Sequence, residues 1–428
     1  MRLMFRTTIF VVAALFAATL PAIAQTPPAM ESVTLEEAVQ RALKNNPTVA
    51  QASEGILRAE ALLQQVRSAA MPTINGHILG VMVNEERKFN DVVTTPLTQG
   101  TLTATFGVPV LAASRWAATS QAREQVGVSV LASAEVRTDI AVATAQTYLA
   151  IIAQRRQVDV NSRALESSMA HLDYARKRLE AGAGTRVNEL RAGTEVAANE
   201  ARLENAHLGV RRAQEALGVL MAANGPVDAA QEPVLAVPPT FDEKGWMALR
   251  PDLRLFAAQE RAADRVWRDS SKDWFPTAIM TFEPQALLPA SIFSTDRSWR
   301  VLLNFTQPLF DGGERKGLRR FRESEFNTSR LAFTGLQIQA RSEVRIAQEA
   351  LRSNERVLAS LRSAAQQANE VLKITTFAFE AGATTNLEVI DAQRVARDAD
   401  SATAVAEDSV TRARLDLLTA LGQFPPQP

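Results

Sequence analysis

Apolar residues recur every seven positions through two stretches of this chain, and the two stretches share the same phase. The first row ends at Leu179 and the second, 200 positions later, at Phe379. The rows are Val158, Leu165, Leu172, Leu179 and Leu358, Ala365, Leu372, Phe379. Seven-residue rows indicate helices that pack along a seam rather than single surface helices. Chance rows in an alanine-rich helix would not share their phase, so the pattern predicts a duplicated coiled coil.

The longest expected helix runs from about Ser114 to Ala181, because no proline interrupts it. At ~1.5 Å per residue such a helix would reach about 100 Å. A glycine turn follows, and a second row (Val196, Leu203, Val210, Leu217) predicts a returning helix. The pattern therefore predicts the same order of elements in each half: a first helix (residues of about 34–70 in the first half), a strand pair and a long helical hairpin.

Strict alternation of apolar and polar residues predicts the strands. Residues 101–108 place Leu102 and Phe106 on one face and threonines on the other, and residues 298–305 alternate in the same way. A further strand begins at Thr277, whereas residues 74–83 are ambiguous. The pattern fits transmembrane β-strands and the half-buried strands of a soluble sheet equally well. Two strand pairs cannot close a membrane barrel, so in a membrane role other copies of the chain would have to pair the open edges, and three copies would give twelve strands.

The expected domain order follows from these repeats. Residues 1–24 combine basic residues, a short apolar run and a small-residue cleavage site, which is typical of a signal peptide. Residues 25–223 form the first repeat and residues 246–428 the second. The proline-rich segment 224–245 joins them as a linker. The fold class is mainly α with a small β part.

Composition argues against most kinds of chemistry. The 428 residues include no cysteine and only three histidines, and 47 acidic residues balance 47 basic ones. There is no thiolate site, no paired metal-ligand spacing and no basic excess for nucleic acid. We expect no catalytic residue, no metal and no cofactor, and therefore no enzyme.

The order of signal peptide, strand pairs, long hairpins and Glu-Ala-Gly-Ala turns resembles the outer-membrane efflux proteins, the TolC-like family. The most specific segments are 34–47, 307–313 (Gln-Pro-Leu-Phe-Asp-Gly-Gly) and the two glycine turns. The resemblance implies a homotrimer in the outer membrane, with a twelve-stranded β-barrel in lipid and an α-helical barrel in the periplasm. It also implies a periplasmic adaptor and an inner-membrane pump or ABC exporter as partners. The implied function is passive export of drugs, small molecules or proteins.

The second glycine turn is followed by a carboxylate pair that the first repeat lacks. Glu388 and Asp391 are spaced to share one helix face, where the first repeat has Asn188 and Arg191. By resemblance, three copies of the pair would form a periplasmic gate. We hypothesise that Arg186 or Arg191 of a neighbouring hairpin pairs with this ring. The alternative is that all four are solvated helix charges.

The remaining candidates also depend on the family. The turns at Gly182, Ala183, Gly382 and Ala383 would be the adaptor docking tips, although glycine there also serves helix reversal. Trp116, Trp274 and Trp299 lie near predicted strand ends, where a membrane aromatic belt would fall. The alternative to the whole interpretation is a periplasmic coiled-coil structural protein with no pore.

Overall fold

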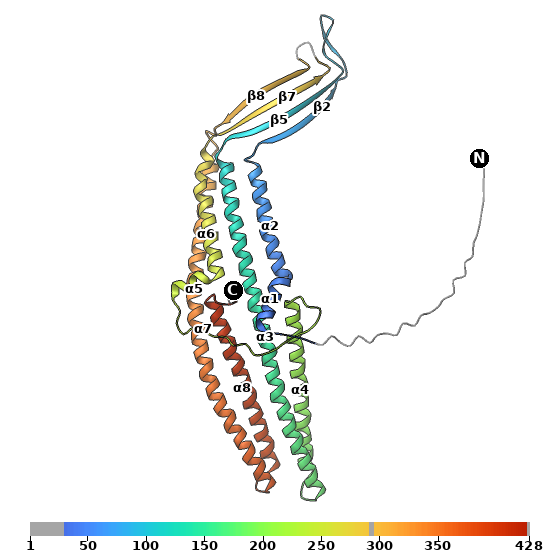
Figure 1. Cartoon of the computed structure of the whole chain (residues 1–428), viewed down its shortest axis with the longest axis vertical. Coiled ribbons are helices and arrows are strands. Elements are labelled where there is room, and N and C mark those ends of the chain that lie inside the picture. The colour runs from blue at the N-terminus through green and yellow to red at the C-terminus, as the bar shows by residue number, and fades with distance from the viewer. Residues whose placement is uncertain (1–29, 291–294, 426–428) are drawn as a thin grey trace, which may run out of the picture.

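The computed structural model describes residues 30–290 and 295–425. The expected signal peptide, 1–24, lies outside the described residues. The molecule is long and narrow, with a sheet at one end and two helical hairpin tips at the other (Figure 1). Both chain halves run the whole length, and the last described residues lie near the middle (Figure 1).

The two long helices match in length and in position within their repeats. Helix α3 spans Ala113–Glu180 and α7 spans Glu314–Glu380, with 68 and 67 residues. The returning helices α4, Arg186–Leu220, and α8, Asn386–Ala420, have 35 residues each. A threonine precedes each of them as the N-cap, Thr185 or Thr385, and its side chain accepts a hydrogen bond from a first-turn amide. The predicted coiled-coil hairpins are therefore confirmed.

The upper half of each long helix packs against a shorter helix instead of the returning one. These are α2, Pro47–Ser68, beside α3, and α6, Pro251–Asp269, beside α7. The predicted single helix of about 34–70 is wrong. It divides into α1, Leu35–Asn45, and α2, because the residue before a proline favours an extended backbone and Asn46 adopts one. The second repeat breaks in the same way between α5, Glu243–Leu249, and α6.

The four long strands form one antiparallel sheet in the order β2-β5-β7-β8. Their bounds are Thr73–Met82, Thr98–Ala112, Thr277–Leu288 and Arg297–Thr306. The ambiguous first strand is a full member: Ile74 pairs with Phe106 and Ile78 with Leu102, so its isoleucines continue the apolar face. On the opposite face the Arg300 guanidinium pairs with Glu283, 2.5 Å apart. The alternation predicted from the sequence thus gives the sheet one apolar surface and one more polar surface.

Two smaller sheets did not emerge from the pattern analysis. Strands β3, Arg87–Phe89, and β4, Val92–Thr95, form a hairpin within the loop between β2 and β5. Near mid-length, β1, Glu31–Val33, pairs in parallel with β6, Val227–Ala229. Strand β6 belongs to the segment predicted as a linker. Three-residue strands are too short to show an alternating pattern.

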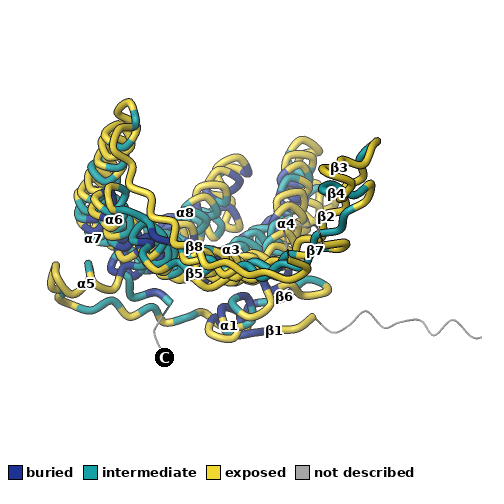
Figure 2. The backbone as a smooth tube through the Cα atoms, turned by 90° about the horizontal axis from the view of Figure 1, so that it is seen from above, coloured by how far each residue is buried: buried dark blue, intermediate teal, exposed yellow. Residues whose placement is uncertain are grey.

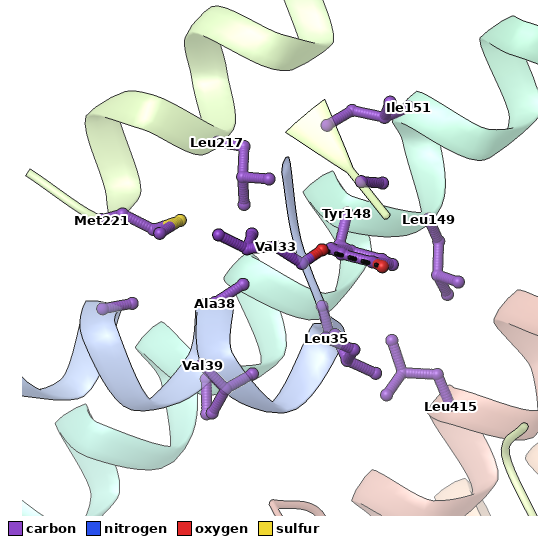
Figure 3. Packing of buried hydrophobic residues seen from close by; sticks show 14 of the residues in the cluster. Val33, Leu35, Ala38, Val39, Tyr148, Leu149, Ile151, Leu217, Met221 and Leu415 are labelled. Atoms are coloured by element: carbon purple, nitrogen blue, oxygen red, sulfur yellow. Dashed lines mark hydrogen bonds between the residues drawn. The ribbon is translucent and has the colours of Figure 1, made fainter. Parts of the chain in front are cut away.

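The largest buried cluster lies around this small parallel sheet (Figure 3). Tyr148 of α3 is fully buried there, and its hydroxyl lies 2.7 Å from the Gln231 carbonyl oxygen and 3.2 Å from that of Val33. Leu217 of α4 and Leu415 of α8 join the same cluster. Viewed along the long axis, the long helices follow an arc, with α1, β1, β6 and α5 along one side of it (Figure 2). The cluster thus ties both hairpins to the middle of the molecule.

Among the described residues, no helix combines the length and the apolar character that crossing a membrane requires.

Candidate gate and docking tips

The two hairpin tips have almost the same backbone. Gly182 and Gly382 have φ angles of 73° and 79°, a left-handed conformation that favours glycine. The amide of Ala183 donates to the Arg178 carbonyl at 2.9 Å, and that of Ala383 to the Ala378 carbonyl at 2.7 Å. Both glycines and both alanines are exposed. The four residues predicted as docking tips therefore form two matching, accessible turns.

The predicted gate residues lie just past these turns. Glu388 and Asp391 are both exposed on the first two turns of α8. Within residues 30–290 and 295–425, neither carboxylate has an ion-pair partner at 4.0 Å or less. Arg186 pairs with Glu189 on its own helix, and Arg191 is exposed. One chain by itself therefore does not bring the predicted acidic pair and the two arginines together.

The two hairpins of one chain do meet beside the tips, through Asn386. Its side-chain oxygen lies 2.7 Å from Nε2 of His171 on α3. Its amide nitrogen donates to the carbonyl oxygen of Asn188 on α4, at 3.5 Å. Phe379 packs on the His171 ring with ring centroids 5.4 Å apart. Burial lowers the pKa of His171, against the opposing effect of the Asn386 hydrogen bond. These contacts hold the start of α8 against the first hairpin.

A second contact between the hairpins is ionic. Glu195 of α4 is only 3% exposed and accepts from two arginines of α8. Arg394 Nη2 lies 2.8 Å from Glu195 Oε2, and Arg397 Nη1 lies 3.0 Å from Glu195 Oε1. The bond to Glu195 raises the pKa of Arg394. Buried carboxylates require such partners, because an unpaired charge in this setting is costly.

Sequence reasoning missed this Glu195 cluster, although a signal was present. At the repeat offset of 200, Glu195 corresponds to Val395, and the arginines correspond to Thr194 and Ala197. An acid confined to one repeat and two bases confined to the other, at nearly the same repeat position, predict a contact between the two.

The three tryptophans lie at the two ends of the sheet. Trp116 is in the first turn of α3, below β5, and Trp274 is in the 3-10 helix η1, Ser270–Trp274, below β7. The Arg315 guanidinium carbon stands 4.3 Å from the centroid of the Trp274 ring. Trp299 lies near the other end, opposite Pro284 in the β7–β8 ladder. All three are exposed.

Comparisons with known proteins agree on one family. The model of the family described as "Outer membrane efflux protein" matches residues 38–223 and 247–423. The chain is 26% identical to outer membrane protein OprJ of Pseudomonas aeruginosa over 381 residues, which cover 84% of this chain and 78% of OprJ.

Two solved structures share the fold. One is a membrane protein from Pseudomonas aeruginosa, with a TM-score of 0.80, 22% identity, and 90% of this chain and 93% of that one covered. The other is the outer membrane protein VceC from Vibrio cholerae, with a TM-score of 0.78, 18% identity, and 91% and 96% covered.

Two matched segments, one in each half, account for most of the sequence. Channels of this family are trimers that work with adaptor proteins and inner-membrane pumps, and they are not enzymes. This decides against a coiled-coil protein without a pore. The chain belongs to the outer membrane efflux protein family and is the outer-membrane channel of a tripartite efflux pump, with a large periplasmic helical portion.

Proposed function

We propose that three copies of this chain surround one axis and form a continuous duct. Each copy would contribute four strands to a twelve-stranded barrel in the outer membrane and two hairpins to a periplasmic helical barrel. The observation that carries this proposal is the sheet with two unpaired edges, β2 and β8. Open edges within a bilayer leave backbone groups without partners, and a closed ring of strands removes them.

The apolar sheet surface would face lipid. Phe106, Phe282 and Val301 lie next to one another on it, since Phe106 pairs with Phe282 and Phe282 with Val301. The Glu283–Arg300 pair lies on the opposite surface, which would line the duct. Trp116 and Trp274 at one end of the strands and Trp299 near the other would lie at the two lipid–water boundaries.

At the periplasmic end, three copies of Glu388 and Asp391 would form an acidic ring that gates the duct. Both carboxylates are exposed and within about one helical turn of each other. In the described part of the chain neither has an ion-pair partner at 4.0 Å or less, and Arg394, which interacts electrostatically with Asp391, is already bound to Glu195. A ring of like charges attracts cations and is costly to close unless basic groups approach.

From the internal repeat we infer that Arg186 of the neighbouring copy would be this basic group. Within one chain, Asn386 donates to the carbonyl oxygen of Asn188. At the repeat offset of 200 positions, Asn386 corresponds to Arg186 and Asn188 corresponds to Glu388. If adjoining hairpins of neighbouring copies pack as the two hairpins of one chain do, Arg186 approaches Glu388. Arg191 has no such counterpart contact.

The two tips would bind the adaptor. Their matching turns, at Gly182, Ala183, Gly382 and Ala383, would give a trimer six similar and accessible docking points. The duct itself would be passive, and an inner-membrane pump or ABC exporter would supply both the energy and the choice of cargo among drugs, small molecules or proteins.

The test is single-channel conductance in planar bilayers. Glu388→Ala with Asp391→Ala should remove block by multivalent cations added from the periplasmic side. Asp173→Ala is the matched control, because Asp173 is an exposed acid near the other tip. Unchanged block in the double variant would contradict the acidic ring, and absence of conductance in the unmodified protein would contradict the duct itself.

The arginine partner is tested by charge exchange. Arg186→Glu should raise the conductance of the resting channel, because repulsion from Glu388 would open the ring. Adding Glu388→Arg should restore the low resting conductance. A resting conductance that Arg186→Glu leaves unchanged would exclude Arg186 as the partner.

A further inference from the structure

The ladder of strand pairs is the same in both repeats. Thr73 pairs with Gly107 in the first repeat, and Thr277 pairs with Thr306 in the second. Every pair from Thr73 to Met82 has its counterpart from Thr277 to Ala286. The first strands thus correspond at a distance of 204 positions and the second strands at 199. This correspondence converts the place of any residue in one repeat into a place in the other.

One junction between repeats is visible inside the chain. Strand β5, the second strand of the first repeat, pairs with β7, the first strand of the second repeat. The counterpart junction would join β8 to a strand equivalent to β2. Both β2 and β8 are edges of the sheet, and both are exposed along their whole length.

We propose that β8 of one copy pairs antiparallel with β2 of the next copy, in the register of the β5–β7 ladder moved by one repeat. This inference rests on the proposed trimer and specifies its contact. The observed pair of Phe106 and Phe282 corresponds to a proposed pair of Phe305 and Ile78 of the next copy. Thr103 opposite Gln285 becomes Leu302 opposite Val81.

This register keeps the apolar faces of both strands on one surface of the barrel and the more polar faces on the other. Phe305 belongs to the apolar surface through its pairing with Ala278, and Ile78 belongs to it through Leu102. A slip by one residue would place the whole apolar set of one strand beside the polar set of the other. The register also places Leu303 opposite Gly80. A Cβ atom added at Gly80 would have no atom within 4 Å, so there is open space at this position.

The same register explains an exposed segment between β8 and α7. In the first repeat, β5 passes an irregularity between Pro109 and Leu111 and continues to Ala112, opposite Thr277. Its counterpart, residues 308–311, lies outside the sheet, with Leu309 90% and Phe310 91% exposed. In the proposed contact Phe310 lies opposite Ile74 of the next copy, as Leu111 lies opposite Ala278. Residues 308–311 therefore become the end of β8 only when the next copy is present.

Cysteine pairs can measure the register, because the natural chain has no cysteine. Directly opposite residues have Cβ atoms about 4.5–5.5 Å apart, near disulfide distance, and a slip of two residues adds about 6.6 Å along the strand. Leu302→Cys with Val81→Cys should yield disulfide-linked dimers and trimers on oxidation. Thr103→Cys with Gln285→Cys is the matched control, which should close within one chain and run as a monomer.

Two slipped pairs complete the experiment: Leu302→Cys with Leu79→Cys, and Asn304→Cys with Val81→Cys. We expect at least tenfold less linked product from each than from the predicted pair. Linking that is equal in all pairs, stronger in a slipped pair, or absent from all three while the control closes would overturn the register. The mass of the cysteine-free protein in detergent reports separately on the trimer, so failure of the assembly is distinguished from failure of the register.

A single cysteine gives an independent measurement. Phe310→Cys should react with a maleimide at least tenfold more slowly in the trimer than in dissociated chains, because the neighbouring β2 would cover it. Equal rates would contradict the extension of β8.

Discussion

The two repeats remain alike in the sheet but differ at the hairpin tips. In the sheet, the ladder of the first repeat recurs pair for pair in the second, although few side chains are shared. At the tips, the turns match, yet the side chains beyond them differ at almost every contact between the hairpins. Asn386 takes the place of Arg186, Arg394 that of Thr194, and Glu195 that of Val395.

The difference follows from what each region must do. A strand ladder is held by backbone groups and by which face is apolar, so many sequences satisfy it. Helices that pack side by side depend on the side chains that meet between them. Where the first hairpin of the chain contacts the second, those side chains are now specialised into donors and acceptors. Comparison of the two repeats therefore separates what maintains the fold from what determines how the hairpins contact each other.

The largest expected effect comes from Glu195. Glu195→Gln removes the buried charge that pairs with Arg394 and Arg397 and leaves Arg397, only 10% exposed at its side chain, with the exposed Asp398 as its remaining acidic partner. Breaking a buried ion pair from one side costs about 3–5 kcal/mol. We expect the free energy of unfolding in urea, measured on the detergent-solubilised protein, to fall by about 3 kcal/mol, the lower end of this range, because Arg397 keeps its pair with Asp398.

The counterpart position supplies the control for Glu195. Val395 is exposed, so Val395→Ala should change the free energy of unfolding by less than about 0.5 kcal/mol. Equal effects at the two positions would mean that the hairpins are not held by the ionic cluster.

A smaller effect is expected at Tyr148, in the middle of the molecule. Tyr148→Phe would remove the hydroxyl that contacts Val33 and Gln231 while leaving the ring in place. Buried groups that lose a hydrogen-bond partner cost about 1–3 kcal/mol. Its counterpart, Gln348, is only partly buried, and Gln348→Ala should cost clearly less in the same unfolding measurement. A Tyr148→Phe cost as small as that of Gln348→Ala would contradict the role of the hydroxyl.

The sequence predicted the parts of the fold that follow a period. Heptad rows placed both hairpins, and alternation placed three of the four long strands with their correct faces. The first strand was ambiguous because Gly76 and Gly80 interrupt its apolar face, while Leu79 and Val81 lie on the opposite face. The helix break at Pro47 is readable in retrospect, since the counterpart Pro251 marks the same break.

The candidate site was less predictable, because its contacts join residues about 200 positions apart. Heptad phase gives the face on which a residue lies, but not which residue of the other hairpin it meets. Glu195 thus resembled an ordinary surface charge, and His171 resembled one of three scattered histidines. Only the packing of α8 against α3 and α4 shows that both are buried.

The tip glycines test whether the two turns, which match in backbone conformation, are equivalent. Gly182→Ala and Gly382→Ala each force a side chain into a left-handed backbone, at a cost of about 1 kcal/mol. Nothing lies within 4 Å of an added Cβ at either position, so backbone strain alone should act. The two substitutions should therefore lower the unfolding free energy equally. Costs that differ by more than twofold would show that the turns are not equivalent.

The smallest effect should be a pH dependence that belongs to one hairpin contact only. Burial lowers the pKa of His171 in the folded protein below its ordinary value near 6.5. The folded chain then keeps His171 neutral while the unfolded chain binds a proton. Stability from this group is fully present above about pH 6.5 and is lost as the pH falls toward the folded pKa. The Asn386 hydrogen bond opposes this shift but is smaller than the effect of burial.

His171→Gln isolates this effect, because glutamine can still donate to Asn386 but does not titrate. The difference in unfolding free energy between the two proteins should be constant above about pH 7 and should shift in favour of the variant as the pH falls. Val371, the exposed counterpart of His171, provides the control: Val371→Gln should give a difference that does not depend on pH. A parallel pH profile for all three proteins would show that protonation of His171 has no influence on how α8 packs against α3, and the asymmetry of the tips would then rest on Asn386 and the Glu195 cluster.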